Sequence, residues 1–216
     1  MAKLLTSRDL ARVSCSSCEG CGECCRGMDD TIHLDPYDLY ELEKHLGKSF
    51  DELFDVRIGL HVEDGLVLPH LLMSGDNVAC TFLGPDGRCG IHDFRPGFCR
   101  LFPLGRRYED RSFGYFVVDG ACPRPCTKVK ISKYLEIPGI GIYERYINTW
   151  HYFCRDVQNQ LRASGDEEFI QRTALRILEI FFTAPYDTDR PFYPQFEERI
   201  APFISVGKTP ASVSGG

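Results

Sequence analysis

The chain has 216 residues, of which 43% are apolar and 26% are charged, and its formal net charge is -6 at pH 7. This length suits one well-packed domain or one domain with an extension, and the acidic balance argues against a nucleic-acid-binding protein. The charge is uneven, because the segment from Arg88 to Lys133 holds ten Lys and Arg residues against four Asp and Glu residues. That stretch either offsets an anionic metal cluster or forms a solvated basic face.

The first residues predict no export signal. Arg8, Asp9 and Arg12 interrupt the place where a signal peptide needs an apolar stretch, and no apolar run is long enough to cross a membrane. We therefore expect a cytoplasmic protein with no membrane and no nucleic-acid partner. In that compartment cysteine groups more often bind metal or catalyse than pair as disulfides, and eleven cysteines cannot all pair.

The first predicted elements are helical. Residues 7–13 have the pattern of a short helix that leads into a run of cysteines. Asp35 followed by Pro36 is typical of a helix start, and Gly47 is placed to end that helix. Ser49 can then cap a second short helix that runs through Phe54.

Two tight turns are predicted next. Asp64-Gly65 suits the turn of a hairpin that spans residues 60–68. A second turn at residues 85–88, Pro-Asp-Gly-Arg, lies between Cys80 and Cys89 and should bring their sulfurs together.

The last third of the chain reads as helical after an aromatic, β-branched strand at residues 113–119. A helix is predicted from one apolar face, formed by Tyr143, Tyr146, Ile147, Trp150, Cys154, Val157 and Leu161. Ser164 and Glu167 resemble a capping box that opens another helix, with the buried stripe Phe169, Ile170, Thr173, Ala174, Ile177, Leu178 and Phe181. A last short helix is expected at residues 197–203.

These elements predict a predominantly helical α+β fold. We expect a cysteine-cluster domain over residues 1–136, with an irregular core organised by metal and short hairpins. A helical extension over residues 137–205 should pack on it, and residues 206–216 should be disordered.

Eight cysteines are the candidate metal ligands. Thiolate selects zinc or iron-sulfur clusters, and two-residue spacings let one turn of backbone present several sulfurs to one centre. Neighbouring side chains of an extended backbone diverge, so Cys24 and Cys25 suggest two adjacent centres. The alternative is a single cluster that uses four of the cysteines, while the others are structural or redox-active. The eight are Cys18, Cys21, Cys24, Cys25, Cys80, Cys89, Cys99 and Cys122.

A rival interpretation uses a different set of four. Cys15, Cys18, Cys21 and Cys25 follow the spacing of bacterial ferredoxins, although Arg26 stands where proline is expected and no second such run exists. That interpretation would include Cys15 as a ligand and exclude Cys24.

Residues beside the cysteines have predicted supporting roles. Arg95 and Arg100 flank Cys99 and either donate hydrogen bonds to cluster sulfurs or backbone carbonyls, or form ordinary salt bridges. For His92 we favour packing over metal ligation, and Cys126 is an extra ligand or a reserve thiol. Cys154 is expected to be a small buried side chain on a helix face.

The pattern around the later cysteines closely resembles the CxxCxxCC (YkgJ-like) cysteine-cluster family, described as zinc- or iron-chelating. The resemblance covers residues 15–126 and maps the family's eight cysteines onto the eight candidate ligands. It rests on Cys80-x-Phe82-Leu83, Asp86-Gly87-Arg88-Cys89-x-Ile91-His92, Arg95-Pro96-x2-Cys99-Arg100-x-Phe102-Pro103 and Cys122-Pro123.

The resemblance implies metal binding and little about a reaction. Larger relatives include flagellin lysine N-methylases, but the Cys-x3-Cys-x2-Cys triad of radical enzymes is absent from this chain. We expect an iron-sulfur cluster, preferably 4Fe-4S, or iron, used in redox or a modification reaction on an unidentified protein partner or substrate. The alternative is a structural zinc module that mediates protein interaction, and the sequence does not decide whether the protein is an enzyme.

Overall fold

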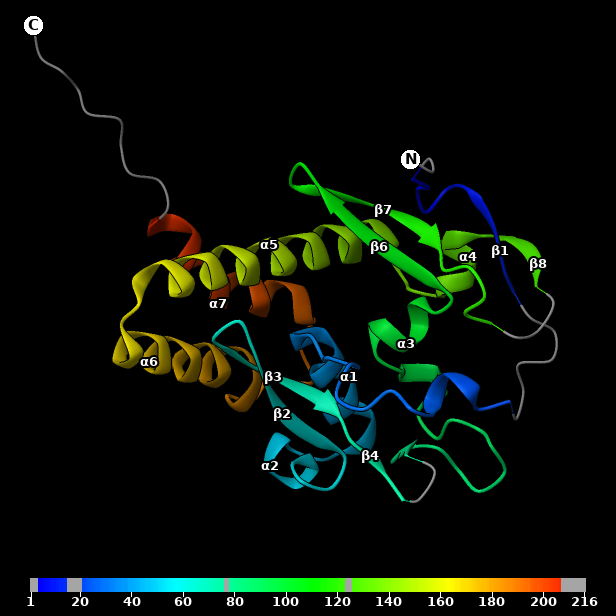
Figure 1. Cartoon of the computed structure of the whole chain (residues 1–216), viewed down its shortest axis with the longest axis horizontal. Helices are drawn as coiled ribbons and strands as arrows, with labels where there is room; N and C mark the ends of the chain where they lie inside the picture. The colour runs from blue at the N-terminus through cyan, green and yellow to red at the C-terminus, as the bar shows by residue number, and fades with distance from the viewer. Residues whose placement is uncertain (1–3, 15–20, 76–77, 123–125, 207–216) are drawn as a thin grey trace, which may run out of the picture.

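The computed structural model describes residues 4–14, 21–75, 78–122 and 126–206 (Figure 1). They form a mixed α+β fold in which each of four small sheets is a single antiparallel strand pair. The predicted fold class is confirmed. The strands are β1 (Leu10–Ser14), β2 (Ile58–Glu63), β3 (Leu66–Leu71), β4 (Met73–Ser74), β5 (Ala79–Cys80), β6 (Leu104–Glu109), β7 (Ser112–Val117) and β8 (Thr127–Lys130).

The predicted N-terminal helix is wrong, because residues 10–14 form strand β1. This strand pairs antiparallel with β8, which lies far along the chain, in a register that puts Leu10 opposite Lys130. Ala11 and Val13 are buried on one side, whereas Leu10 and Arg12 are exposed on the other, which is the two-residue alternation of a half-buried strand. Pairing with a remote segment therefore overrides the local helical pattern.

The two predicted helix starts after the cysteine run are confirmed. Helix α1 (Pro36–Leu46) begins at the cap Asp35, whose carboxylate accepts hydrogen bonds from the backbone of Tyr37 and Asp38. The helix ends at Gly47, which adopts the left-handed conformation with φ of 63°. Ser49 and Glu52 form a reciprocal capping box that opens α2 (Phe50–Leu53).

The predicted hairpin is also confirmed, with longer strands than expected. β2 and β3 pair along their full length, and Glu63 lies opposite Leu66. Asp64 and Gly65 both have positive φ, 49° and 86°, as a two-residue turn that matches the strand twist requires.

Three long helices follow the second hairpin, β6–β7. Helix α5 (Ile140–Ser164) buries the predicted apolar face, and Tyr152 is buried in addition. Helix α6 (Glu167–Leu178) continues into a π-helical turn η3 (Glu179–Thr183), and the last helix, α7 (Phe192–Val206), is longer than predicted. The capping box predicted from Ser164 is wrong, since Asp166 caps α6 by accepting a hydrogen bond from Phe169.

One large hydrophobic core joins the first half of the chain to the helical part. It contains residues of α1, α2 and the β2–β3 hairpin together with the inner faces of α5, α6 and α7. Figure 1 shows α5 running along one side of the molecule, with α1 and the β2–β3 hairpin beneath it. Trp150 of α5 packs against the rings of Phe181, Phe182 and Phe196 in this core. The domain boundary at residues 136–137 stays a prediction.

The remaining short elements lie near the cysteines. They are η1 (Glu23–Cys25), η2 (His92–Phe94), α3 (Gly97–Leu101) and α4 (Ile131–Leu135). Across the described part of the chain, no helix has the length and apolar character needed to cross a bilayer. The tail predicted to be disordered lies outside the described residues, apart from Val206, which ends α7.

Candidate metal centre

Five of the predicted ligands lie on three short elements and one turn. Cys24 and Cys25 end the 3-10 turn η1, Cys80 ends β5, and Cys99 lies in the middle of α3. Cys89 follows the predicted turn at residues 85–88, where Gly84 donates to and accepts from the backbone across the loop. An isolated antiparallel β-bridge pairs Leu83 with Cys89. It brings the chain back towards Cys80, as the sequence predicted.

The Cys24 and Cys25 sulfurs lie 4.0 Å apart. This differs from the extended backbone assumed for the pair, since η1 is a tight helical turn that starts at Gly22 in the left-handed conformation. Two side chains on such a turn diverge less than those on a strand. The premise that these two cysteines point in opposite directions is therefore wrong, although the assignment to two centres stays a prediction.

The charges of the five thiols influence one another, so the five lie within electrostatic range of each other. The hydrogen bond from Cys25 lowers the pKa of Cys24 to about 6, whereas the same bond and burial raise the pKa of Cys25. Burial chiefly raises the pKa of Cys80, Cys89 and Cys99, and a negative charge on Cys24 raises each of these further. Thiols that are close together and partly buried resist sharing several negative charges unless a cation neutralises them.

In the described part of the chain, the other predicted ligands do not join this group of five thiols. Cys21 and Cys122 are half-buried and make no hydrogen bond with the five in this part of the chain. Cys18 lies outside the described residues, as does Cys15 of the ferredoxin alternative. No three Cys, His, Asp or Glu side chains in the described ranges are already arranged around one metal position.

Asp38 holds the helix that carries Cys99, and sequence reasoning missed this role. The Asp38 carboxylate accepts a hydrogen bond of 2.7 Å from the backbone of Gly97, the first residue of α3. A Cβ atom at Gly97 would lie 2.3 Å from the Tyr143 hydroxyl, so only glycine permits this close approach. The sequence contains a cue that Asp38 is structural. It stands three residues after the cap Asp35, at the position where a capping box places a carboxylate.

The basic residues near Cys99 act on its surroundings in two ways. Arg100 donates hydrogen bonds to the backbone carbonyls of Asp93 and Leu135, one of the two roles predicted for it. Arg95 bonds to His92, and its positive charge lowers the pKa of Cys24 and Cys89. His92 is exposed, so its predicted packing role is wrong.

Cys154 lies away from the group of five thiols. It is buried in the large core on helix α5, where burial raises its pKa. The prediction of a small buried side chain is confirmed.

The group of soft sulfur donors defines a cysteine-rich, metal-chelating class of protein. A family model described as CxxCxxCC, "Putative zinc- or iron-chelating domain", matches residues 17–133, and the chain belongs to this family. The match spans all eight predicted ligands and supports metal binding. Neither the curated proteins nor the solved structures include a match to this chain.

Proposed function

We propose that the chain binds an iron-sulfur cluster or iron through its cysteine group and uses it in redox or a modification reaction. The observation that carries the proposal is the gathering of five thiols, Cys24, Cys25, Cys80, Cys89 and Cys99, from segments far apart in the sequence. A closed structural zinc site takes four ligands, so the group holds more sulfur than one such site needs. Cys18, Cys21 and Cys122 would add further ligands for a cluster or for a second centre.

The protein would supply position and electrostatics to such a centre, while iron would supply the capacity to change oxidation state. Arg95 fits this supporting role, since its buried Nε atom has no hydrogen-bond partner among the described residues. A guanidinium N–H directed at a metal-bound thiolate stabilises the negative charge and tunes the centre. Asp38 would fix the position of Cys99 through Gly97.

A structural zinc module is the second candidate, and the Cys24–Cys25 separation favours it. Two thiolates bound to one tetrahedral zinc ion, each about 2.3 Å from the metal, lie about 3.8 Å apart. The sulfurs of Cys24 and Cys25 are 4.0 Å apart before any metal is considered. Zinc has no redox chemistry, so this centre would hold the fold together and leave partner binding to the helical part.

Anaerobic purification followed by metal and acid-labile sulfide analysis distinguishes the two candidates. An iron-sulfur protein should be brown, contain sulfide and lose visible absorbance on reduction. A colourless protein with stoichiometric zinc and no sulfide would overturn the first proposal and support the second. A protein that binds neither metal after anaerobic reconstitution would contradict both.

Single substitutions then test the ligand set. Cys24→Ala and Cys25→Ala should each lower metal content, because both sulfurs belong to the described group. Cys154→Ala is the matched control, since this buried cysteine lies on α5 in the hydrophobic core and should leave metal content unchanged. Full metal content in the Cys24 or Cys25 variant would remove that residue from the ligand set.

A further inference from the structure

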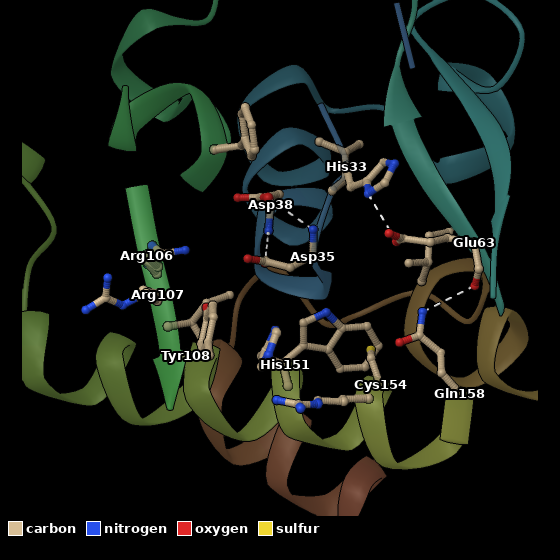
Figure 2. Close-up of a pocket in the computed structure, with 16 residues that line it drawn as sticks. His33, Asp35, Asp38, Glu63, Arg106, Arg107, Tyr108, His151, Cys154 and Gln158 are labelled. Atoms are coloured by element: carbon tan, nitrogen blue, oxygen red, sulfur yellow. Dashed lines mark hydrogen bonds and ion pairs between the residues drawn. The ribbon is translucent and has the colours of Figure 1, made fainter. Parts of the chain in front are cut away.

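A pocket of about 620 Å³ lies between strand β6, the start of α1, helix α5 and the end of the β2–β3 hairpin, and Phe98 of α3 also lines it. Figure 2 shows Arg106 and Tyr108 on one side, Asp35 and Asp38 above, and side chains of α5 below. This volume is within the usual range for sites that bind small organic molecules.

The buried lining of the pocket is apolar apart from the carboxylates of Asp35 and Asp38. Its five apolar side chains are those of Leu34, Leu68, Ile147, Trp150 and Cys154. Such a surface favours the apolar part of a ligand, since covering it removes hydrocarbon from water.

Two guanidinium groups line the pocket and form no ion pair with a carboxylate of the described residues. Arg106 donates a hydrogen bond to the Tyr143 hydroxyl at 2.9 Å, and its buried Nε atom has no partner among the described residues. Arg155 is exposed and lies over the Tyr152 ring, and it forms no ion pair within the described part of the chain. Arg107 differs, because Glu109 pairs with it at 2.7 Å.

The acidic residues of the pocket have other partners, although the positive charge of Arg106 also acts on Asp35 and Asp38. These two aspartates accept hydrogen bonds from backbone groups and from Tyr146, and burial raises the pKa of both by more than the charge of Arg106 lowers it. Glu63 lies 3.5 Å from His33 on the far side of the pocket. Among the described residues Arg155 forms no ion pair, so its charge is available to an anion, and Arg106 adds a second positive charge that it shares with the two aspartates.

An additional planar surface stands beside these arginines. The rings of Tyr108 and His151 are stacked with centroids 3.5 Å apart and an angle of 9° between them. Burial and the neighbouring arginines lower the pKa of His151, so the imidazole is neutral at pH 7 and adds no charge. The pocket thus combines a largely apolar interior with a cationic edge.

We propose that this pocket binds a small amphipathic organic anion. A carboxylate or phosphate head would contact Arg106 and Arg155, and an apolar chain or ring would cover Trp150 and Leu68. A carboxylate is a planar oxyanion and a phosphate is a tetrahedral one. Guanidinium groups bind both through paired hydrogen bonds. The proposal holds whichever metal the cysteines bind, because no cysteine of the metal-binding group lines this pocket.

The single tryptophan of the chain gives a direct measurement, because Trp150 lines the pocket. Octanoate and octyl phosphate are transparent probes with the proposed chemistry, 1-octanol lacks the charge, and inorganic phosphate lacks the chain. The full chain should show a saturable change in tryptophan fluorescence with at least one of the two amphipathic anions. The anion that binds with higher affinity identifies the preferred head group. Compared with that anion, 1-octanol and inorganic phosphate should each bind at least about tenfold more weakly.

Variants separate the proposed site from general hydrophobic binding. Arg155→Gln should weaken binding of the better anion about tenfold, and circular dichroism should show an unchanged fold because Arg155 is exposed. Arg145→Gln is the matched control, since Arg145 is an exposed arginine of the same helix outside the pocket, and its affinity should equal that of the wild type. Arg106→Lys, which keeps a positive charge at this half-buried position, should bind more weakly than the wild type.

Three outcomes would overturn the proposal. These are no saturable change with either anion, equal affinity for 1-octanol and the anions, or wild-type affinity in the Arg155→Gln variant.

Discussion

At the scale of single residues, the buried carboxylates of helix α1 connect two parts of the molecule. Asp35 caps α1 and accepts a hydrogen bond from the Tyr146 hydroxyl of α5, while Asp38 reaches α3 through Gly97. Buried polar groups are costly unless they are paired, and each of these carboxylates has several partners. The pair therefore fixes α3, and with it Cys99, relative to the core.

Glu43 should make stability fall as pH rises through neutrality. Burial raises its pKa to about 7, and its Oε1 atom accepts a hydrogen bond of 2.9 Å from the backbone of Phe50. The folded state thus holds a proton that the unfolded state releases near pH 4.5. The contribution of Glu43 to the free energy of unfolding is fully present below about pH 4.5 and is lost as pH rises through about 7.

Glu43→Gln tests this expectation, because the amide oxygen keeps the acceptor and removes the titration. Urea unfolding at pH 5 and pH 8 should show a smaller loss of stability with pH in the variant than in the wild type. Histidines with lowered pKa, such as His33, act in the opposite direction but are common to both proteins. The same pH dependence in both proteins would exclude this role for Glu43.

At the scale of elements, helix ends were the most predictable feature. The start of α1 at Asp35 and of α2 at Ser49 could be predicted, since each cap is determined by a few neighbouring residues. The start of α6 could not be placed correctly, because Ser164, Asp166 and Glu167 offer competing caps within four positions. The path of the chain from α5 through Gly165, with φ of 64°, selects Asp166.

Replacing Asp166 with alanine should destabilise the protein by about 1 kcal/mol, the usual cost of losing an N-cap. Its side chain accepts a hydrogen bond of 3.1 Å from the backbone of Phe169, which alanine cannot replace. Thermal or urea unfolding gives the change in the free energy of unfolding, with Ser164→Ala as the matched variant. A larger loss for Ser164→Ala would mean that the serine is the energetically important cap.

At the scale of the whole molecule, the cysteine group lies at the edge of a core in which Cys80 is the only predicted metal ligand among the described residues. Cys25, Cys89 and Cys99 are only partly buried and pack against that core, which is built mainly from aliphatic and aromatic side chains. Burial of such side chains is the main source of folding stability. The helical part should therefore persist when metal is lost.

Metal removal with a chelator should lower Tm by at least about 5 °C, because a ligand that binds only the folded state stabilises it. The far-ultraviolet helical signal at 20 °C should remain near that of the metal-bound protein. The Cys24→Ala variant is the control, since loss of its metal should leave little for the chelator to remove. Loss of most helical signal on chelation would show that the core itself requires metal.

The sequence by itself determined those features whose causes lie within a few residues. These are the caps of α1 and α2, the Asp64-Gly65 hairpin and the apolar face of α5, together with membership of the cysteine-cluster family. Tertiary structure decided the features that depend on distant segments. Strand β1 exists because β8 pairs with it, and the arginines of β6 and α5 line one pocket only because the core brings these elements together. Local signals cannot specify such features, since their stabilising partners are not neighbours along the chain.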